Sequence, residues 1–383
     1  HLLLLVLHQR RSNSFYYTDL YEHLLVTTAN QFGFKNKLST DMCIFSLKQV
    51  IEYYKYYNSP VYISYLDASK AFEKINLWHL FNKLLARKVP CIIVGLLLTW
   101  YSCQKYVIRW SSCISSPFSV SNGVPQGQIL SPILFNLYMN DLSVRLNQQV
   151  IGCNYYGVVM NHMFYADDSV LLAPSPSALQ KLLNICYNYG CDFEIKYNVK
   201  KTECMCVKPK GCRSLLIPDL FLGGQVLNFT DCKKYLGAFI CDNLSDDKDI
   251  KRQVRSVYTK GNLLIKKFRN CTSEVKVKLF KSYCSSFYGC NLWARSSDAS
   301  RRKLVVAYKQ IFRNFMKCQR LGTTQQMLML HVDPYDVIYR KLVFSFRNRI
   351  FNCDNLLVKT IASSLHFYST YLYNQWNKVL FTL

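Results

Sequence analysis

Two adjacent carboxylates between apolar segments constrain the fold of this chain more than any other feature. The run reads Phe164-Tyr-Ala-Asp-Asp-Ser-Val-Leu-Leu-Ala173. This pattern predicts two buried strands that turn back on each other at the acids. Adjacent acids repel each other, so the turn needs a compensating cation, and hard divalent ions such as Mg²⁺ prefer oxygen ligands of this kind. An acid pair is also common in ordinary solvated turns, and the pair alone does not decide between the two interpretations.

A second acid follows another predicted strand upstream. Residues 61 to 66 are β-branched, aromatic or apolar except for Ser64, and Asp67 comes directly after them. This composition predicts a buried strand that ends at Asp67. A lone Asp at a strand end is usually a turn former or a helix cap. Asp67 therefore indicates a metal site only in combination with the acid pair.

Between the two acid sites, a loop with Gly and Pro leads into an apolar helix. It reads Ser121-Asn-Gly-Val-Pro-Gln-Gly-Gln-Ile-Leu-Ser-Pro132. We expect Ser131 to cap the helix and Pro132 to take its first position. Such a loop is commonly no more than a turn.

Hydrophobic spacing predicts further elements along the chain. The expected helices cover residues 41 to 57, 77 to 85, 91 to 103, 132 to 146 and 175 to 190. Short strands are expected at 105 to 110 and 118 to 120, at 193 to 197 and 203 to 208, and in a hairpin near 235 to 241. Long helices are expected beyond the hairpin.

In their order and spacing, the three acid and loop segments resemble motifs A, B and C of reverse transcriptases. The likeness is closest to non-LTR (LINE-type) retrotransposon enzymes of the jockey and CR1 kind, and it covers roughly residues 31 to 295. Residues 31 to 40 resemble the fingers segment before motif A, 198 to 202 resemble motif D, and 235 to 239 resemble the primer-grip hairpin.

This resemblance implies an α+β fold, a right-hand polymerase with partial fingers, an antiparallel-sheet palm with helices on one face, and a helical thumb. The implied domains are partial fingers with a truncated N-terminus (1–60), a palm with inserted fingers elements (61–241), a thumb (242–297) and a C-terminal helical extension (298–383). The extension has no assigned function.

The implied activity is that of an RNA-directed DNA polymerase, which transfers nucleotides from dNTPs to a primer 3′-OH. Two Mg²⁺ ions, or Mn²⁺ in their place, would stabilise the attacking 3′-oxygen and the leaving pyrophosphate. Asp67 and Asp167 would bridge both metals, and Asp168 would ligate in part or tune the site. The implied partners are an RNA template, a DNA primer or target and dNTPs, with no membrane and no obligate protein partner.

The resemblance also assigns roles around the metals. Phe72 would be the steric gate that excludes a ribose 2′-hydroxyl, although a core Phe is the simpler interpretation. Lys201 would protonate the leaving pyrophosphate, with the adjacent Lys200 as an alternative. The other assigned residues are Ala68, Gln126 and Gly127 at the nucleotide and Tyr235, Leu236 and Gly237 in the primer grip.

Two departures from the family pattern keep other classes of protein open. Relatives usually have Asp at the position of Glu73 and Gly at the position of Gln128, where a larger side chain could crowd the loop. The alternatives are an inactive retrotransposon relic that only binds nucleic acid, and a viral RNA-dependent RNA polymerase, which typically carries Gly-Asp-Asp instead.

The charge of the chain favours a polyanionic partner. It has 48 basic and 23 acidic residues, a formal net charge of +25. Residues 248 to 281 carry eleven Lys and Arg against Asp249 and Glu274. Five of these are predicted to grip the nucleic-acid backbone, with a solvated helix face as the alternative: Lys251, Arg252, Arg255, Lys266 and Lys267.

Cysteine usage and hydropathy give two further expectations. The 17 cysteines include no Cys-x-x-Cys pair, and their odd number argues against a complete disulfide framework, so we expect reduced core thiols. The longest apolar stretch, residues 91 to 100, is well short of the ~20 residues that a membrane span needs. Residues 1 to 7 are apolar but lack a basic flank, so no signal peptide is expected and the protein is expected in the cytoplasm and nucleus.

Overall fold

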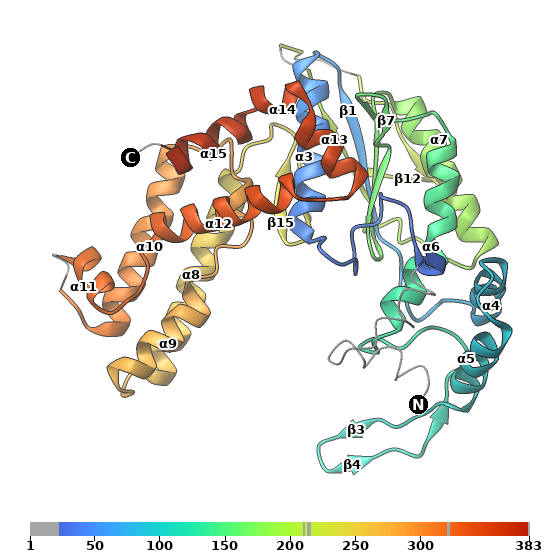
Figure 1. Cartoon of the computed structure of the whole chain (residues 1–383), viewed down its shortest axis with the longest axis horizontal. Helices are drawn as coiled ribbons and strands as arrows, with labels where there is room; N and C mark the ends of the chain where they lie inside the picture. Colours follow the sequence, from blue (N-terminus) through green and yellow to red (C-terminus); the bar gives the residue numbers. More distant parts are fainter. Residues whose placement is uncertain (1–22, 210, 213–215, 320–321, 382–383) are drawn as a thin grey trace.

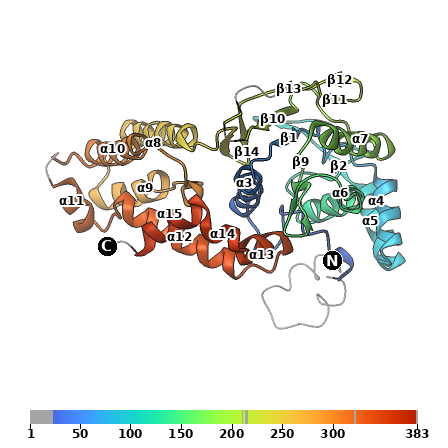
Figure 2. The ribbon, with the colours of Figure 1, turned by 90° about the horizontal axis from the view of Figure 1, so that it is seen from above.

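The computed structural model describes residues 23–209, 211–212, 216–319 and 322–381. A mixed arrangement of helices and strands forms an arch, with a five-stranded sheet near its centre (Figure 1). Helices α4 to α7 lie on one side of the sheet region, and α8 to α12 lie on the other (Figure 2).

The central sheet has the strand order β13-β10-β1-β9-β8. Its strands are β1 (Val61–Leu66), β8 (His162–Tyr165), β9 (Asp168–Ala173), β10 (Glu203–Val207) and β13 (Asn228–Phe229). Neighbouring strands are antiparallel except β10 and β13, which pair in parallel. The strands predicted at 61–66 and 203–208, and on both sides of the acid pair, are therefore confirmed.

The strand predicted at residues 193 to 197 is wrong. Helix α7 (Pro176–Asp192) continues further than its pattern indicated, and Glu194 then turns the chain with a φ of 58°. Within the described residues this segment contributes only an isolated bridge, between Tyr197 and Ala68.

Helices cover both faces of the sheet, so the expectation of helices on one face is also wrong. All six residues of β1 are buried. Val61 and Ile63 pack in a core with α3 (Thr40–Tyr56), and Tyr62 packs in a second core with α7 and α6 (Ser131–Gln148). The physical reason is that β1 is apolar on both of its faces, as is typical of a strand between two layers.

Helices α4 (Leu77–Ala86) and α5 (Cys91–Cys103) confirm the two predictions made for this part of the chain. A long hairpin follows them and projects from the end of the arch (Figure 1). It consists of two short pairs, β2 (Lys105–Tyr106) with β5 (Phe118–Ser119) and β3 (Arg109–Trp110) with β4 (Cys113–Ile114).

The start of α6 differs from the prediction by one residue, so Pro132 takes the second helical position and not the first. Ser131 is the first residue of the helix and not its cap, and Leu130 takes the cap position. The Ser131 hydroxyl instead donates to the Pro125 carbonyl at 2.5 Å and closes the preceding loop. The side chain is therefore not available to cap the helix.

Beyond residue 241 the chain is helical, as predicted. Its helices are α8 (Asp247–Phe268), α9 (Ser273–Cys284), α10 (Asp298–Met316), α11 (Thr323–Met329), α12 (Tyr335–Phe351), α13 (Leu356–Ser363), α14 (Leu365–Ser369) and α15 (Tyr371–Phe381). The remaining short elements are η2 (His23–Leu25), β6 (Asn154–Tyr155), β7 (Val158–Val159), β11 (Phe221–Leu222), β12 (Gln225–Val226) and η3 (Cys290–Leu292). Trp376 of α15 is fully buried and stacks on Phe45 of α3 at 6.1 Å, so the C-terminal helices share a core with the sheet region.

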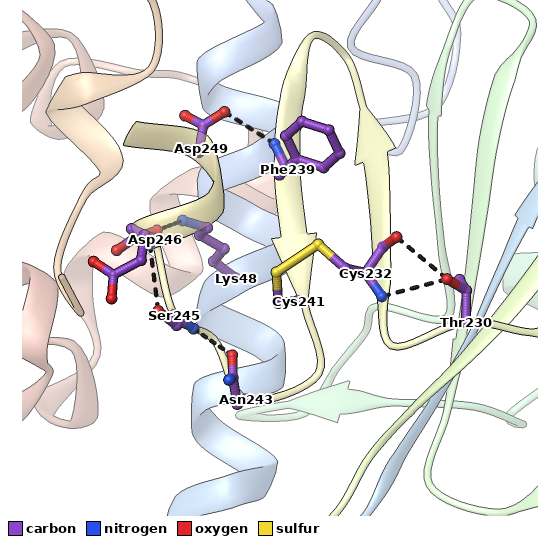
Figure 3. Close-up of a disulfide and its surroundings, with 10 residues drawn as sticks. Lys48, Thr230, Cys232, Phe239, Cys241, Asn243, Ser245, Asp246 and Asp249 are labelled. Carbon is purple, nitrogen blue, oxygen red and sulfur yellow. Dashed lines mark hydrogen bonds and ion pairs between the residues drawn. A yellow bond between two sulfur atoms is a disulfide. The ribbon is translucent and has the colours of Figure 1, made fainter. Parts of the chain in front are cut away.

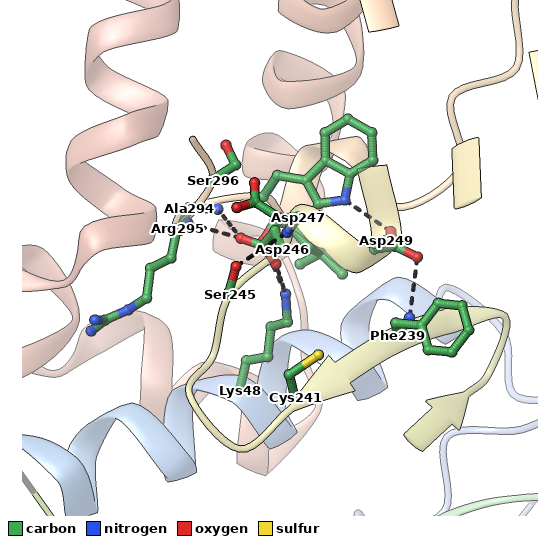
Figure 4. A network of polar contacts seen from close by, with 12 residues as sticks. Lys48, Phe239, Cys241, Ser245, Asp246, Asp247, Asp249, Ala294, Arg295 and Ser296 are labelled. Carbon is green, nitrogen blue, oxygen red and sulfur yellow. Dashed lines mark hydrogen bonds and ion pairs between the residues drawn. The ribbon is translucent and has the colours of Figure 1, made fainter. Parts of the chain in front are cut away.

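Asp246, just before α8, joins the sheet region to the helical region (Figure 4). Its carboxylate accepts a hydrogen bond from Lys48 Nζ at 2.6 Å and from the backbone N–H groups of Ala294 and Arg295 at 2.8 Å each. Only 2% of Asp246 is exposed. A carboxylate this deeply buried is costly unless it is paired, and these three donors supply the pairing.

The hairpin of β14 (Cys232–Tyr235) and β15 (Ala238–Cys241) corrects the expectation that all cysteines are reduced core thiols. Cys232 and Cys241 face each other in the strand register and form a disulfide (Figure 3). The cause is local, because a two-residue turn places its flanking strands in register and brings the two side chains together. The other 15 cysteines, all among the described residues, are free, and four of them are exposed.

In the part of the chain that the structure describes, no helix combines the length and the apolar character needed to cross a membrane.

Candidate active site

The sheet brings Asp67 close to Asp168. Leu66 and Ser169 form the last antiparallel pair of β1 and β9, and the two aspartates come one position beyond it. Directly opposed residues of antiparallel strands have Cα atoms roughly 4.5–5.5 Å apart. Strand pairing alone therefore places these two carboxylates side by side.

Asp167 is carried by the turn that connects β8 and β9. Tyr165 pairs with Asp168, which leaves Ala166 and Asp167 as the two central residues of the turn. Ala166 has a φ of 56°, in the left-handed region. Positive φ at the first central position is typical of a type II′ turn, where Gly is the usual residue.

The electrostatics of the three acids confirm that they lie in one another's field. Burial raises the pKa of Asp168, the charges of Asp167 and Asp67 raise it further, and Lys233 opposes these effects, which leaves the pKa at about 6. Burial also raises the pKa of Asp167. A hydrogen bond from the residue's own backbone lowers this pKa, and the charge of Asp67 raises it. The partly buried acids therefore repel one another, and a bound cation would relieve this repulsion.

Asp67 and Asp168 line a cavity of about 500 Å³ that also gathers lysines and a hairpin turn. The wall formed by the other segments consists of Lys200, Lys201, Glu203, Lys233, Lys234, Tyr235, Leu236 and Gly237. The cavity thus brings Asp67 and Asp168 together with the predicted motif D and primer-grip residues, whereas Asp167 does not line it. Lys200 and Lys201 both line it, so the geometry does not choose between them.

The donor set fits a hard divalent ion, although it is not a closed metal cage. Across the described ranges of the chain, no group of three or more His, Cys, Asp or Glu is arranged to hold a metal ion. Mg²⁺ is usually bound through one or two carboxylates, together with substrate phosphates and water. Two neighbouring aspartates at a strand end are sufficient for that kind of binding.

Residues 4–240 match the family described as "Reverse transcriptase (RNA-dependent DNA polymerase)", which is more than half of the chain. The chain belongs to the reverse transcriptase family. The match includes all three aspartates and nearly all of the hairpin that lines the cavity with Asp67 and Asp168.

The named relatives confirm the predicted likeness to reverse transcriptases of non-LTR retrotransposons. The chain is 24% identical over 353 residues to a probable RNA-directed DNA polymerase from transposon X-element of Drosophila melanogaster, which covers 86% of this chain and 37% of that protein. It is 33% identical over 184 residues to the Pol polyprotein of the type-2 element R2DM from the same species (46% and 17%). It is 25% identical over 263 residues to the RNA-directed DNA polymerase from mobile element jockey of Drosophila funebris (65% and 28%). The chain thus spans well under half of each of these relatives.

A telomerase structure from Candida tropicalis aligns with 100% of this chain and 54% of its own, at 12% identity and a TM-score of 0.43. This likeness is too distant to support any assignment.

The loop before α6 is bonded to the turn that follows Asp67. The N–H groups of Gly123 and Val124 donate to the carbonyls of Ile75 and Phe72, both at 2.8 Å. Gly123 has a φ of 89°, and a Cβ at this position would lie 2.5 Å from the Glu73 carbonyl oxygen. Only glycine permits this approach, so the spacing of motifs A and B depends on it.

The predicted nucleotide-binding residues divide between this loop and the turn. Gln126 and Gly127 are exposed, and Gln126 lines a cavity of about 340 Å³ together with Tyr101 and Tyr106. Ala68 is half-buried. The ring of Phe72 stacks on Phe135 of α6 at 4.3 Å and is half-buried, so Phe72 also serves packing, and its gate role stays a prediction.

The segment from residue 198 to 202 holds the backbone of Asp67. The Asp67 N–H donates to Thr202 Oγ1 at 3.2 Å, and the Asn198 N–H donates to the Asp67 carbonyl at 2.8 Å. Thr202 is fully buried. The segment predicted as motif D therefore fixes the strand end from which the first aspartate projects.

The predicted nucleic-acid-binding residues of α8 do not all face solvent. Lys251, Arg255, Lys266 and Lys267 are exposed. Arg252 is only partly exposed, and its Nε donates to the buried Asp249 at 2.7 Å. Four of the five residues remain candidates for a backbone contact, whereas Arg252 has a structural partner.

Sequence reasoning missed two residues at the site. Lys233 lowers the pKa of Asp168 and binds Glu203 at 2.6 Å, and its place two residues before Tyr235 on a strand could have indicated the same face. Gln31 accepts a hydrogen bond from the Ala166 N–H at 3.0 Å. Nothing in a single sequence links Gln31 to the turn, because the two are 135 residues apart.

Proposed function

We propose that this chain forms the polymerase portion of an RNA-directed DNA polymerase of a non-LTR retrotransposon. It would copy an RNA template by adding dNTPs to the 3′-OH of a DNA primer. The observation that carries this proposal is the position of Asp67 and Asp168 at the ends of neighbouring strands, lining one cavity with the hairpin turn at Leu236. In a chain of the reverse transcriptase family, this is the arrangement that nucleotidyl transfer requires.

Asp67 and Asp167 would hold Mg²⁺, with Mn²⁺ as an alternative, and Asp168 would contribute in part. When bound, a pair of such ions stabilises the attacking and leaving oxygens of the transfer. The protein's own part is to hold these carboxylates still. Thr202 and Asn198 fix the backbone of Asp67, and strand pairing fixes Asp168.

A lysine of the same cavity would give a proton to the departing pyrophosphate. Lys201 is our first candidate, and Lys200 lines the same cavity. Both are exposed, so neither carries the desolvation cost of a buried ammonium. Phe72 would select deoxynucleotides, and Gln126 and Gly127 would lie under the incoming nucleotide and the templating base.

The proposed subdomains follow the predicted boundaries. Residues up to 60 would belong to the fingers, 61–241 to the palm with inserted fingers elements, and 242–297 to the thumb. Residues 298–383 would extend the thumb, and the burial of Trp376 against Phe45 supports an integral structural role for them. The exposed basic face of α8 would contact the template–primer backbone.

A primer-extension assay tests this function. The chain is incubated with poly(rA)/oligo(dT), labelled dTTP and Mg²⁺, and parallel reactions omit the template, the primer or the metal. We expect incorporation that requires all three. If the folded chain binds the template–primer but extends it with neither Mg²⁺ nor Mn²⁺, the polymerase proposal is wrong and the inactive-relic alternative is favoured.

A further inference from the structure

A short extended segment lies along the strand that leads into the acid turn. Gln31 forms a parallel bridge with Phe164 of β8, the Phe32 N–H donates to the Phe164 carbonyl at 2.8 Å, and the Phe164 N–H donates to the Asn30 carbonyl at 2.8 Å. The segment therefore extends the sheet beyond its edge strand. It ends beside the turn that carries Asp167.

The side chain of Gln31 is bonded to that turn. Its Oε1 accepts from the Ala166 N–H at 3.0 Å and from the Gly33 N–H at 2.9 Å. Only 2% of Gln31 is exposed. Two backbone donors fix which amide atom is the oxygen, because a nitrogen at that position could not accept from them.

The backbone N–H of Ala166 needs a hydrogen-bond acceptor from outside the turn. It is 4% exposed, so its N–H would be buried without a partner if Gln31 did not accept from it. Its φ of 56° is also unfavourable for a residue with a Cβ. A turn in this conformation persists only where its surroundings fix it, and Gln31 provides the fixing hydrogen bond.

Gly33 seats the segment closely against the same peptide. A Cβ at this position would lie 2.5 Å from the Ala166 nitrogen. The Gly33 carbonyl in turn accepts from Asn136 Nδ2 of α6 at 2.8 Å. A continuous set of contacts thus runs from the motif B helix, through Gly33 and Gln31, to the backbone N–H of Ala166, the residue immediately before Asp167.

We propose that Gln31 is a positioning residue whose side-chain oxygen holds the Ala166 peptide and so aims the Asp167 carboxylate at Asp67. This inference rests on the proposed polymerase function. The mutual repulsion of the acids would otherwise let the turn relax outward, because strand pairing fixes Asp168 but not the two central residues of the turn. The amide nitrogen of Gln31 has no hydrogen-bond partner within the described structure, so only the oxygen is needed.

Three variants separate this role from general packing. Gln31→Met keeps the size of the side chain and removes the acceptor, whereas Gln31→Glu keeps an acceptor oxygen. Gln49→Met is the matched control, because Gln49 of α3 is 1% exposed and makes no hydrogen bond to the turn within the described residues. Gly33→Ala leaves Gln31 intact but pushes on the Ala166 nitrogen, so it remains informative if Gln31→Met does not fold.

The first measurement needs no catalysis. Amide hydrogen exchange across residues 164 to 168 should be at least tenfold faster in Gln31→Met than in the parent, and unchanged in Gln49→Met. Titration of Mn²⁺, followed by electron paramagnetic resonance without nucleic acid or dNTP, should give at least fivefold weaker binding in Gln31→Met and Gly33→Ala. Binding by Gln31→Glu should stay within about twofold of the parent.

The second measurement separates an effect on kcat from an effect on KM. In primer extension, Gln31→Met should lower kcat at least tenfold, with the KM for template–primer unchanged. Suppose that the parent extends primers and that Gln31→Met has the same exchange rates and Mn²⁺ affinity as the parent. This result would overturn the positioning role and leave the polymerase function intact. A parent that neither binds Mn²⁺ nor extends primers would instead remove the proposed function, and this inference with it.

Discussion

Asp249, in the first turn of α8, accepts a hydrogen bond from the backbone N–H of Phe239 at 3.1 Å (Figure 4). The same carboxylate accepts from Trp293 Nε1 at 2.9 Å and from Arg252 Nε at 2.7 Å. It is 2% exposed. A single buried side chain thus fastens the long basic helix to the hairpin that lines the acid cavity.

Removal of this carboxylate should destabilise the chain strongly. We expect Asp249→Ala to lower the free energy of unfolding by about 3–5 kcal/mol, because Arg252 loses its buried partner and two N–H donors are left unpaired. Chemical denaturation followed by tryptophan fluorescence measures this change. The matched control is Asp298→Ala, an exposed acid in the first turn of α10, which should cost less than about 1 kcal/mol. Equal effects of the two variants would contradict the fastening role.

His162 of β8 predicts an acid-sensitive stability. It is fully buried between Ser143 and Asn161, and burial lowers its pKa to about 3. The His162 imidazole therefore stays neutral in the folded protein, whereas in the unfolded chain it takes up a proton below about pH 6.5. The stability from this group is complete above that pH and is lost as the pH falls towards 3.

Between pH 7 and pH 5, His162 should account for about 2 kcal/mol of lost unfolding free energy. Denaturation of the parent and of His162→Gln at both pH values measures this contribution. The variant should lose about 2 kcal/mol less than the parent over the interval, whatever its stability at pH 7. An identical loss in both proteins would show that another group causes the pH dependence.

The exposed basic face of α8 predicts a steep dependence of RNA binding on salt. Each phosphate contact contributes roughly −0.7 to −0.9 to the slope of log K against log salt. Replacement of Lys251, Arg255 and Lys266 by Ala should therefore flatten the slope by about two to three units. We omit Arg252 because its loss would also unpair Asp249.

A matched triple variant lies on helices other than α8: Lys181→Ala, Lys303→Ala and Lys359→Ala, all at exposed positions. It removes the same charge and should leave the slope within about half a unit of the parent. Similar flattening by both triples would indicate that net charge, and not this face of α8, sets the salt dependence.

Phe72 is expected to discriminate between sugars by steric exclusion. Phe72→Val should raise the ratio of kcat/KM for rNTP over dNTP at least tenfold, which corresponds to about 1.4 kcal/mol at the transition state. Phe81→Val is the control, because Phe81 lies on the buried face of α4 and is 5% exposed. An equal loss on both substrates in Phe72→Val would mean that stacking on Phe135 is the whole role of the ring.

Local pattern was sufficient to predict the strands and helices that carry the acids. The apolar run before Asp67 and the apolar segments around Asp167 each specify a buried strand, and the pairing of β1 with β9 then joins them. The disulfide was also accessible in principle. Once a two-residue turn at Leu236-Gly237 is assumed, the register places Cys232 opposite Cys241.

The remaining features depend on contacts between distant parts of the chain. The strand predicted near residue 195 was wrong because α7 continues and Glu194 turns the chain, which the apolar pattern does not encode. The hydrogen bond between Gln31 and Ala166 and the ion pair of Arg252 with Asp249 were not predictable from one sequence. Side-chain contacts of this kind produce no periodic pattern in the sequence. Helices on both faces of the sheet could have been expected from β1, which is apolar on both faces apart from Ser64.

Primer extension by Asp167→Asn is the decisive experiment on the catalytic role of the acid turn. Asn keeps the size of the side chain and removes the charge that the proposed metal site needs. We expect extension of poly(rA)/oligo(dT) to fall at least a thousandfold, about 4 kcal/mol at the transition state, while binding of the template–primer stays within about threefold of the parent. If Asp167→Asn extends the primer as fast as the parent, the three aspartates are not the catalytic centre and the proposed polymerase site is contradicted.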